Sequence, residues 1–448
     1  MNFFITFLLI LPIIVLFFWL FKDQYNFLYF LIFILPIQTI VLSKLAILNI
    51  IDEHVFQVLS VMKELALAVA LINAILFKDK IKKLNKKFYL LILLNIFLII
   101  SSLILPNIIY GIDNNIKTTI YGLRASLLPI LILYVGYKAE INSVKIKNAF
   151  KYIYFTTIII CLFGFIELLY VDRNYLIDGL VDYNILKGEN PDAYINADLT
   201  YIVEYGGFLI KRMMSVYLSP LQLGYYLVVP ISIGMVSKKN KLYLFLTMLS
   251  LILTGTRAVI LGLTLSVILW FRKNFLLLIS FILILALIII LTPLYKIIYS
   301  IISFEDPSFN AHLYAYTDVA QNLLNFPFGI GLGQAGPIGH FINGGGGLYS
   351  TENQSIGESL FLTIAMERGF QGLIFFILIC LYIIKINISP YKSFISSEYN
   401  ILSRSIVLAT FIYLIASITT EVWISFQVGA LYWWLAGHSI RAGYSAKV

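Results

Sequence analysis

The chain has 448 residues, of which 60% are hydrophobic and only 12% are charged, and its formal net charge is +9. A soluble domain carries about 25% charged residues, and a soluble fold could not hide so much apolar surface from water. The high hydrophobicity excludes a disordered chain, and the presence of only two cysteines excludes a disulfide scaffold. We therefore predict an all-α fold, a polytopic transmembrane helix bundle in which residues 1–448 form a single integral membrane domain.

Apolar runs close to the length of a bilayer crossing predict about 12–13 transmembrane helices of about 20 residues each. The pair 242–254 and 258–271 is short and is interrupted by a Thr-Gly-Thr-Arg sequence at 254–257. We expect two helices that meet there in a tight turn, and one long kinked helix is the alternative. In chain order the runs cover roughly residues 3–21, 25–42, 58–77, 88–105, 118–137, 152–170, 215–236, 242–254, 258–271, 275–295, 361–384, 406–420 and 428–440.

The basic residues predict the orientation of the bundle. Lys and Arg cluster in short connectors such as 78–87 and 138–151, and clusters of this kind mark the cytoplasmic side of a membrane protein. The C-terminus is then cytoplasmic and the N-terminus lies outside. Residues 1–20 contain no Lys or Arg, so we expect a retained first helix and no cleaved signal peptide. Because no basic stripe alternates with aromatic residues, we expect no nucleic-acid partner.

Two long loops fall on the outer side in this topology, at about residues 171–214 and 296–360. The first is acidic, and the second is rich in Gly, Asn and Tyr. Loops of this length are uncommon and usually functional. We expect each of them to fold partly as short helices that lie on the outer face.

Few polar residues interrupt the apolar runs. Glu167, Lys63 and Glu64 are the main ones, and we expect them near helix ends, whereas a transporter would place ionisable residues near the membrane midplane on broken helices. Cys161 and Cys380 have no His or Cys neighbour at metal-ligand spacing, so we interpret them as apolar fillers. We expect neither a metal site nor another cofactor.

Three arginines break the rule that basic residues lie inside, namely Arg124 within a helix, Arg212 at a membrane re-entry and Arg257 in an outer turn. Placing an arginine within the bilayer costs about 2.5–3.5 kcal/mol even on the most permissive scale, so such residues tend to be functional. If the three guanidinium groups converge, they form an anion site suited to phosphate, because the planar group can bind two oxygens at once. The alternative is that each arginine reaches lipid headgroups or pairs with a loop carboxylate.

Four segments carry a resemblance to a known family. Residues 211–220 resemble an R-x-x-S-x-x-x-x-P re-entry, residues 253–262 resemble a T-x-S-R turn with Thr256 in place of the common Ser, and residues 327–333 resemble a P-x-G-x-G-x-G loop. Residues 358–372 resemble a loop exit that continues as E-x-G-x-x-G. Together these segments resemble the O-antigen polymerase and O-antigen ligase superfamily over about residues 118–376.

The resemblance implies a membrane glycosyltransferase that acts at the outer face of a bacterial inner membrane. It would polymerise or ligate glycans linked to undecaprenyl diphosphate, as for O-antigen, capsule or exopolysaccharide. Its expected partners are an undecaprenyl-diphosphate-linked oligosaccharide and membrane lipid, with a chain-length regulator protein as a further candidate. The exit lacks the H-N pair that is common in ligases, and this departure favours a polymerase. A ligase and a flippase or transporter of lipid-linked oligosaccharides are the alternatives.

The expected chemistry assigns roles to a few residues. Arg124, Arg212 and Arg257 would bind the diphosphate, and Arg257 would also stabilise the charge that develops on this leaving group. The acceptor hydroxyl needs a base, for which we favour Glu358 and place His312 second. Other candidates in the same loop are Glu305, Asp306, Asp318 and His340.

Residues 331–336 match the pattern G-x-G-x-x-G. We reject a dinucleotide site, because no βαβ unit surrounds the pattern. A tight turn with exposed backbone N–H groups near a sugar or phosphate and a simple flexible turn remain as alternatives.

Overall fold

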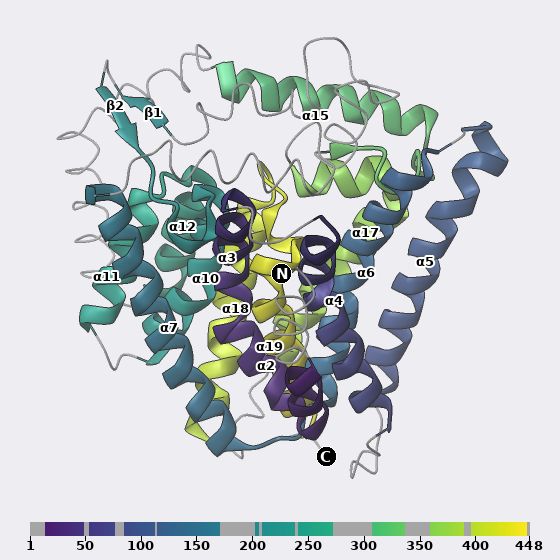
Figure 1. The fold of residues 1–448 in the computed structure, drawn as a ribbon. Coiled ribbons are helices and arrows are strands. Elements are labelled where there is room, and N and C mark those ends of the chain that lie inside the picture. Colours follow the sequence, from purple (N-terminus) through teal and green to yellow (C-terminus); the bar gives the residue numbers. More distant parts are fainter. Residues whose placement is uncertain are drawn as a thin grey trace.

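The computed structural model describes residues 14–48, 53–76, 85–112, 114–170, 202–205, 208–237, 241–271, 307–336, 359–388 and 396–445. These residues form a helical bundle with a small hairpin and one helix at its outer end (Figure 1). After a first helix over 14–22, the α-helices are α2 (Gln24–Phe33), α3 (Leu35–Ile47), α4 (Glu53–Leu76), α5 (Lys86–Tyr110), α6 (Ile116–Lys138), α7 (Ser143–Tyr170), α10 (Pro220–Ser237), α11 (Lys241–Leu253), α12 (Arg257–Phe271), α15 (Pro307–Asn325), α17 (Leu360–Ile388), α18 (Ser397–Ala416) and α19 (Phe426–Ser445).

The fold is that of a multi-pass membrane protein. Among the described residues, seven helices are long and apolar enough to cross a membrane, and the bent pair α2 and α3 brings the number to eight if it forms one span. The predicted run 275–295 and most of the run 3–21 lie outside the described residues. The prediction of a polytopic helix bundle is confirmed.

We expected the run 25–42 to form one helix, but it does not. It is broken after Ile34 into α2 and α3, which meet at an angle of 52°. Pro36 is the cause, because proline has no N–H to continue a helix and restricts the residue before it. The same proline fits the first turn of α3, where its missing N–H costs nothing.

The two outer loops fold differently from each other. In the second loop, α15 lies across the outer end of the bundle (Figure 1), in agreement with the expectation of a surface helix. In the first loop, β1 (Ile202–Tyr205) pairs with β2 (Phe208–Lys211) in an antiparallel hairpin, so the expectation of helix is wrong for this part. The C-terminus and the basic connection between α6 and α7 lie at the opposite end of the bundle, as the distribution of charge predicts.

The C-terminal helix α19 lies in the middle of the bundle and is buried along nearly its whole length. Its closest neighbour is α6, and glycines on both helices allow the two backbones to approach. A Cβ atom at Gly437 would overlap the carbonyl oxygen of Leu133, and one at Gly136 would overlap the carbonyl oxygen of Trp434.

We therefore expect Gly437→Ala to destabilise the protein by ~1–3 kcal/mol, the usual cost of overpacking, although alanine favours a helix more than glycine does. Gly234→Ala in α10 is the matched control, because only the Tyr243 and Leu244 side chains, at 3.1 to 3.4 Å, would face its new methyl group. Thermal unfolding of the purified protein in detergent measures both. Equal unfolding temperatures would contradict the tight α6–α19 contact.

Candidate active site

The segment that re-enters the membrane after β2 holds an unusual backbone conformation. Ser215 and Leu218 have φ angles of +53° and +52°, in the left-handed region that residues other than glycine rarely adopt. Ser215 is the first residue of the short 3₁₀ helix η2 (Ser215–Tyr217), and Leu218 directly follows its last residue. The Ser215 hydroxyl donates a hydrogen bond to the carbonyl oxygen of Ile160 in α7, at 2.6 Å. A strained backbone of this kind persists only where its surroundings fix it.

Glu167 of α7 holds the backbone of this re-entry segment in place. Its fully buried side chain accepts hydrogen bonds at Oε2 from the backbone N–H groups of Met214 (3.0 Å) and Ser215 (2.9 Å). Its Oε1 lies 3.4 Å from Nζ of Lys211. The buried carboxylate is thus compensated by one cation and two N–H groups, as a buried charge requires. Because these partners lie on both sides of Arg212, Glu167 sets the position of this arginine.

Arg212 lies against the turn between α11 and α12. Its Nε donates to the carbonyl oxygen of Thr254 at 2.7 Å, and the N–H of the next residue, Met213, donates to Leu253 at 2.9 Å. Gly255 takes a φ angle of +61° in this turn, and α12 begins directly afterwards with the exposed Arg257. The expected tight turn between two helices is confirmed. Arg212 is hydrogen-bonded to this turn at Thr254, and Arg257 follows it as the first residue of α12.

The Thr256 hydroxyl joins this turn to the start of α10. It donates to the carbonyl oxygen of Pro220 at 3.2 Å and accepts from the Thr254 hydroxyl at 2.9 Å. Gly224 leaves the room for it, because a Cβ atom there would overlap the Thr256 hydroxyl. The re-entry segment and the T-x-T-R turn, which are separate motifs in the sequence, therefore form one structural unit.

This unit has the electrostatics of an anion site on the outer side. Two arginines lie on it, one of them at the first residue of the 15-residue helix α12, where the helix dipole also favours negative charge. Several of its hydroxyl and backbone groups bind one another, so the arginines are held on a firm base. Such an arrangement suits the oxygens of a phosphate or diphosphate.

The structure places the third predicted arginine elsewhere. Arg124 of α6 forms an ion pair and hydrogen bond with Glu64 of α4, and their side chains are 40% and 19% exposed. No described contact joins Arg124 to the turn that holds Arg212 and Arg257. Lys63 and Glu64 also lie near the middle of α4, because this helix begins at Glu53, so the expectation that they lie near a helix end is wrong. Glu167, three residues before the end of α7, is near a helix end as expected.

We expect Arg124→Ala to impair the protein by leaving the Glu64 carboxylate without its cation. The double variant Arg124→Gln with Glu64→Gln separates this structural effect from a role in substrate binding. If the pair is structural, the double variant regains thermal stability and glycan synthesis. If it regains stability but makes no product, Arg124 acts on the substrate.

The glycine-rich loop at 327–336 packs against α17. The N–H of Ile330 donates to the carbonyl oxygen of Met366 at 2.8 Å. The N–H groups of Gly331 and Gly333 donate to Glu367, to its carbonyl oxygen at 3.2 Å and to Oε1 at 2.8 Å. The expectation that these N–H groups are exposed to a sugar or phosphate is therefore wrong, and the buried residues 330–335 are not a simple flexible turn either.

The other side of this loop contacts the break in α17 and the helix α6. Gly369 interrupts α17 with a φ angle of +70°, and a Cβ atom there would overlap the carbonyl oxygen of Pro327. Gly122 of α6 leaves room for the backbone of Gly333 in the same way. Arg368, the residue of α17 that precedes Gly369, is buried and donates to the Ser126 hydroxyl of α6. The P-x-G-x-G-x-G and E-x-G-x-x-G motifs are thus also one structural unit.

The segments that carry these motifs were compared with known protein families. Residues 242–377 match the family described as O-antigen ligase (Wzy_C), and this range holds three of the four motifs. This match supports the resemblance to the O-antigen ligase and polymerase superfamily over residues 242–377. Members of this family are membrane glycosyltransferase-like enzymes, which act as ligases or polymerases. No curated protein matches the chain.

Most of the predicted bases, namely Glu358, Glu305, Asp306 and His340, lie in parts of the second loop outside the described residues. The backbone of His312 lies in α15, but its side chain is outside the described part, and Asp318 lies on the same helix. The assignment of Glu358 or His312 as the base therefore stays a prediction.

The outer turn between α18 and α19 supplies a carboxylate that the sequence analysis missed. Glu421 accepts at Oε2 from the Thr363 hydroxyl in the first turn of α17, at 2.9 Å, and it lies beside Gly336 at the end of the glycine-rich loop. Its only sequence signal is its position in a short polar connection on the side where the two long loops lie.

This outer turn is held at the end of the bundle by several hydrogen bonds. The Ser359 hydroxyl donates to the carbonyl oxygen of Ser417 at 3.1 Å, and the N–H of Leu360 donates to Thr420 at 3.3 Å. The Tyr316 hydroxyl of α15 donates to the carbonyl oxygen of Ile418 at 2.7 Å. Burial raises the pKa of Tyr316 above its ordinary value, so this hydroxyl stays protonated and can donate.

The turn between α11 and α12, which carries Arg257 and contacts Arg212, is called the arginine turn. It lies at a similar depth to the outer turn. Gly262 of α12 packs against Ile412 of α18, and the two helices run in opposite directions. By helical rise, Arg257 lies about 7.5 Å further out than Gly262, and Ala416 lies about 6 Å further out than Ile412. The neighbouring outer ends of α12 and α18 therefore carry Arg257 and the turn that leads to Glu421.

Among the described residues, no group of three His, Cys, Asp or Glu side chains comes close enough to hold a metal ion. Cys161 and Cys380 are both buried and free, in agreement with a packing role.

Proposed function

We propose that the chain polymerises oligosaccharide repeat units linked to undecaprenyl diphosphate at the outer face of the bacterial inner membrane. The observation that supports this most is the placement of Arg212 and Arg257 on one fixed outer turn. The diphosphate of the donor would bind these guanidinium groups. The product would be an O-antigen, capsule or exopolysaccharide, and a chain-length regulator is a candidate partner.

The reaction joins two sugars and releases the lipid diphosphate. A hydroxyl oxygen of the acceptor attacks C1 of the donor sugar and forms the new glycosidic bond, while the bond from C1 to the diphosphate oxygen breaks with its electron pair. The arginines stabilise the negative charge that develops on the leaving group, best where water is scarce. The hydroxyl proton passes to a base, for which Glu358, His312 and Glu421 are the candidates.

A ligase of the same superfamily, which would transfer the finished polymer to another acceptor, is the alternative. Deletion of the gene separates the two. A polymerase mutant should carry single repeat units on its surface glycan, whereas a ligase mutant should show bare acceptor and stored polymer. Surface glycan of normal length in the deletion strain would contradict both.

Glu421→Gln tests the base on the outer turn. If Glu421 takes the proton, this variant should lower the polymerisation rate by about 10²–10⁴-fold, the usual contribution of general base catalysis. Glu398→Gln is the matched control, because its carboxylate lies in the first turn of α18, at the opposite end of this helix from Glu421. An unchanged rate in Glu421→Gln would leave Glu358 and His312 as the bases to test.

A further inference from the structure

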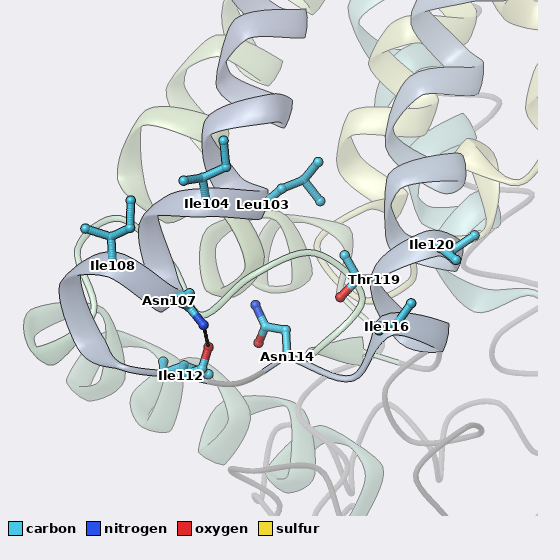
Figure 2. A pocket seen from close by; sticks show the side chains of 9 residues that line it. All are labelled: Leu103, Ile104, Asn107, Ile108, Ile112, Asn114, Ile116, Thr119 and Ile120. Carbon is cyan, nitrogen blue, oxygen red and sulfur yellow. Dashed lines mark hydrogen bonds between the residues drawn. The ribbon is translucent and has the colours of Figure 1, made fainter.

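The outer ends of α5 and α6 diverge (Figure 1), and a groove lies between them (Figure 2). Its volume is about 430 Å³, within the range of roughly 300–1,000 Å³ that is usual for ligand pockets. Its walls are mainly isoleucines, Ile104 and Ile108 from α5 and Ile116 and Ile120 from α6. Each of these four side chains is more than half exposed. The groove therefore opens toward the surrounding lipid.

The inner part of the groove is wholly apolar, and its polar side chains lie only toward the outer mouth, beside Ile108, Ile112 and Ile116. Leu103 and Ile104 line the inner part, and Leu103 lies about 10 Å below the end of α5 by helical rise. Asn107, Asn114 and Thr119 lie at the mouth (Figure 2). Oδ1 of Asn114 is buried and has no hydrogen-bond partner within the described part of the chain. This gradient fits an amphiphile whose chain points into the membrane and whose polar group lies at the mouth.

The isoleucine walls favour a stiff chain. Isoleucine keeps essentially one side-chain rotamer in a helix, so the shape of the groove is fixed before anything binds. A polyprenyl chain has a double bond and a methyl branch in every unit, and it therefore loses less conformational freedom on binding than a saturated acyl chain. A fixed groove thus discriminates in favour of the polyprenyl chain.

The groove cannot serve the donor that binds the arginine turn. In Figure 1, α5 and α6 lie on one flank of the bundle, and α11 and α12 lie on the opposite flank. A polymerase, however, joins two lipid-linked glycans, and the second one needs its own place in the membrane. The mouth of the groove adjoins the glycine-rich loop, because the Asn114 side chain packs against Gly331.

We propose that the groove between α5 and α6 binds the polyprenyl chain of the acceptor, the lipid-linked repeat unit whose hydroxyl attacks the donor. This inference rests on the proposed polymerase function. It places the two lipid chains on opposite flanks, with their glycans extending over the outer end of the bundle toward each other.

Photolabelling tests the proposal in the full-length protein in lipid nanodiscs. The probe is a single repeat unit on a polyprenyl diphosphate that carries a diazirine in its chain. We expect the label on peptides of α5 and α6, and we expect Ile108→Trp and Ile120→Trp to reduce it about tenfold by filling the groove. Ile109→Trp is the matched control, because Ile109 is 47% exposed on α5 but does not line the groove; it should keep full labelling.

Three results would overturn the proposal. The first is that the probe labels Ile120→Trp as strongly as Ile109→Trp. The second is that excess phosphatidylethanolamine removes the label, and the third is that a polymer-carrying donor labels the groove as strongly as the single repeat unit does. Labelling does not depend on turnover, so it is independent of the polymerase assay. The proposed function fails separately if the unaltered protein makes no polymer from lipid-linked repeat units.

Discussion

Arg257→Ala should lower the rate of polymer formation by about 10²–10³-fold, the usual loss when one group that stabilises a developing negative charge is removed. Lipid-linked single repeat units should accumulate as a result. Arg257 is exposed at the start of α12, so the folded state should tolerate the change. A polymer ladder from cells and a rate measurement with purified protein both report the effect.

Two further variants make this result specific. Arg257→Lys keeps the charge but loses the planar group that binds two oxygens, so it should retain only part of the activity. Arg404→Ala removes an exposed arginine from α18 away from the arginine turn and should leave the ladder unchanged. If Arg257→Ala makes polymer of normal length and amount, the arginine turn is not the diphosphate site.

Glu167→Ala should have the second large effect, because it removes the carboxylate that holds the re-entry segment. The N–H groups of Met214 and Ser215 would lose their acceptor inside the protein, and Lys211 would lose its ion pair while keeping its hydrogen bond to the backbone carbonyl oxygen of residue 167. Removing one partner of a buried ion pair costs about 3–5 kcal/mol. We expect both a lower unfolding temperature and loss of polymer, since Arg212 is no longer held against Thr254.

The buried thiol of Cys161, on the same helix as Glu167, provides the measurement. Its reaction with a fluorescent thiol reagent on heating follows the opening of this region. Glu140→Ala, which removes an exposed carboxylate from the connection between α6 and α7, is the control and should react as the unaltered protein does. Unchanged unfolding and activity in Glu167→Ala would show that the strained backbone does not depend on this side chain.

The sequence predicts the helices well, because the thickness of the bilayer sets the length of each apolar run. It predicts their ends less well. Helix α7 begins at Ser143, well before the apolar run at 152, because a membrane helix can continue for two or more turns in water. The same effect moved Glu64 from an expected helix end to the middle of α4, where it meets Arg124.

The motifs identify segments that meet in the structure, but they do not predict what each residue within them does. From spacing alone, the glycines of the loop are expected either to contact a sugar or phosphate or to form a flexible turn, and the serine of the re-entry has no assigned role. The structure shows that Ser215 binds Ile160 and that Gly331 and Gly333 bind Glu367. These contacts join residues far apart in the chain, so spacing cannot predict them. Glu421 was missed for the same reason, because its closeness to Thr363 is visible only in three dimensions.

The central position of α19 has a consequence for biogenesis. Of the described helices, α19 is synthesised last, yet α6 and its other neighbours surround it. The earlier helices must therefore remain in the membrane with the central position empty until α19 has been made, and the tertiary structure of the bundle can form only after that. A truncation that removes even this one segment should leave an assembly for quality-control proteases to degrade.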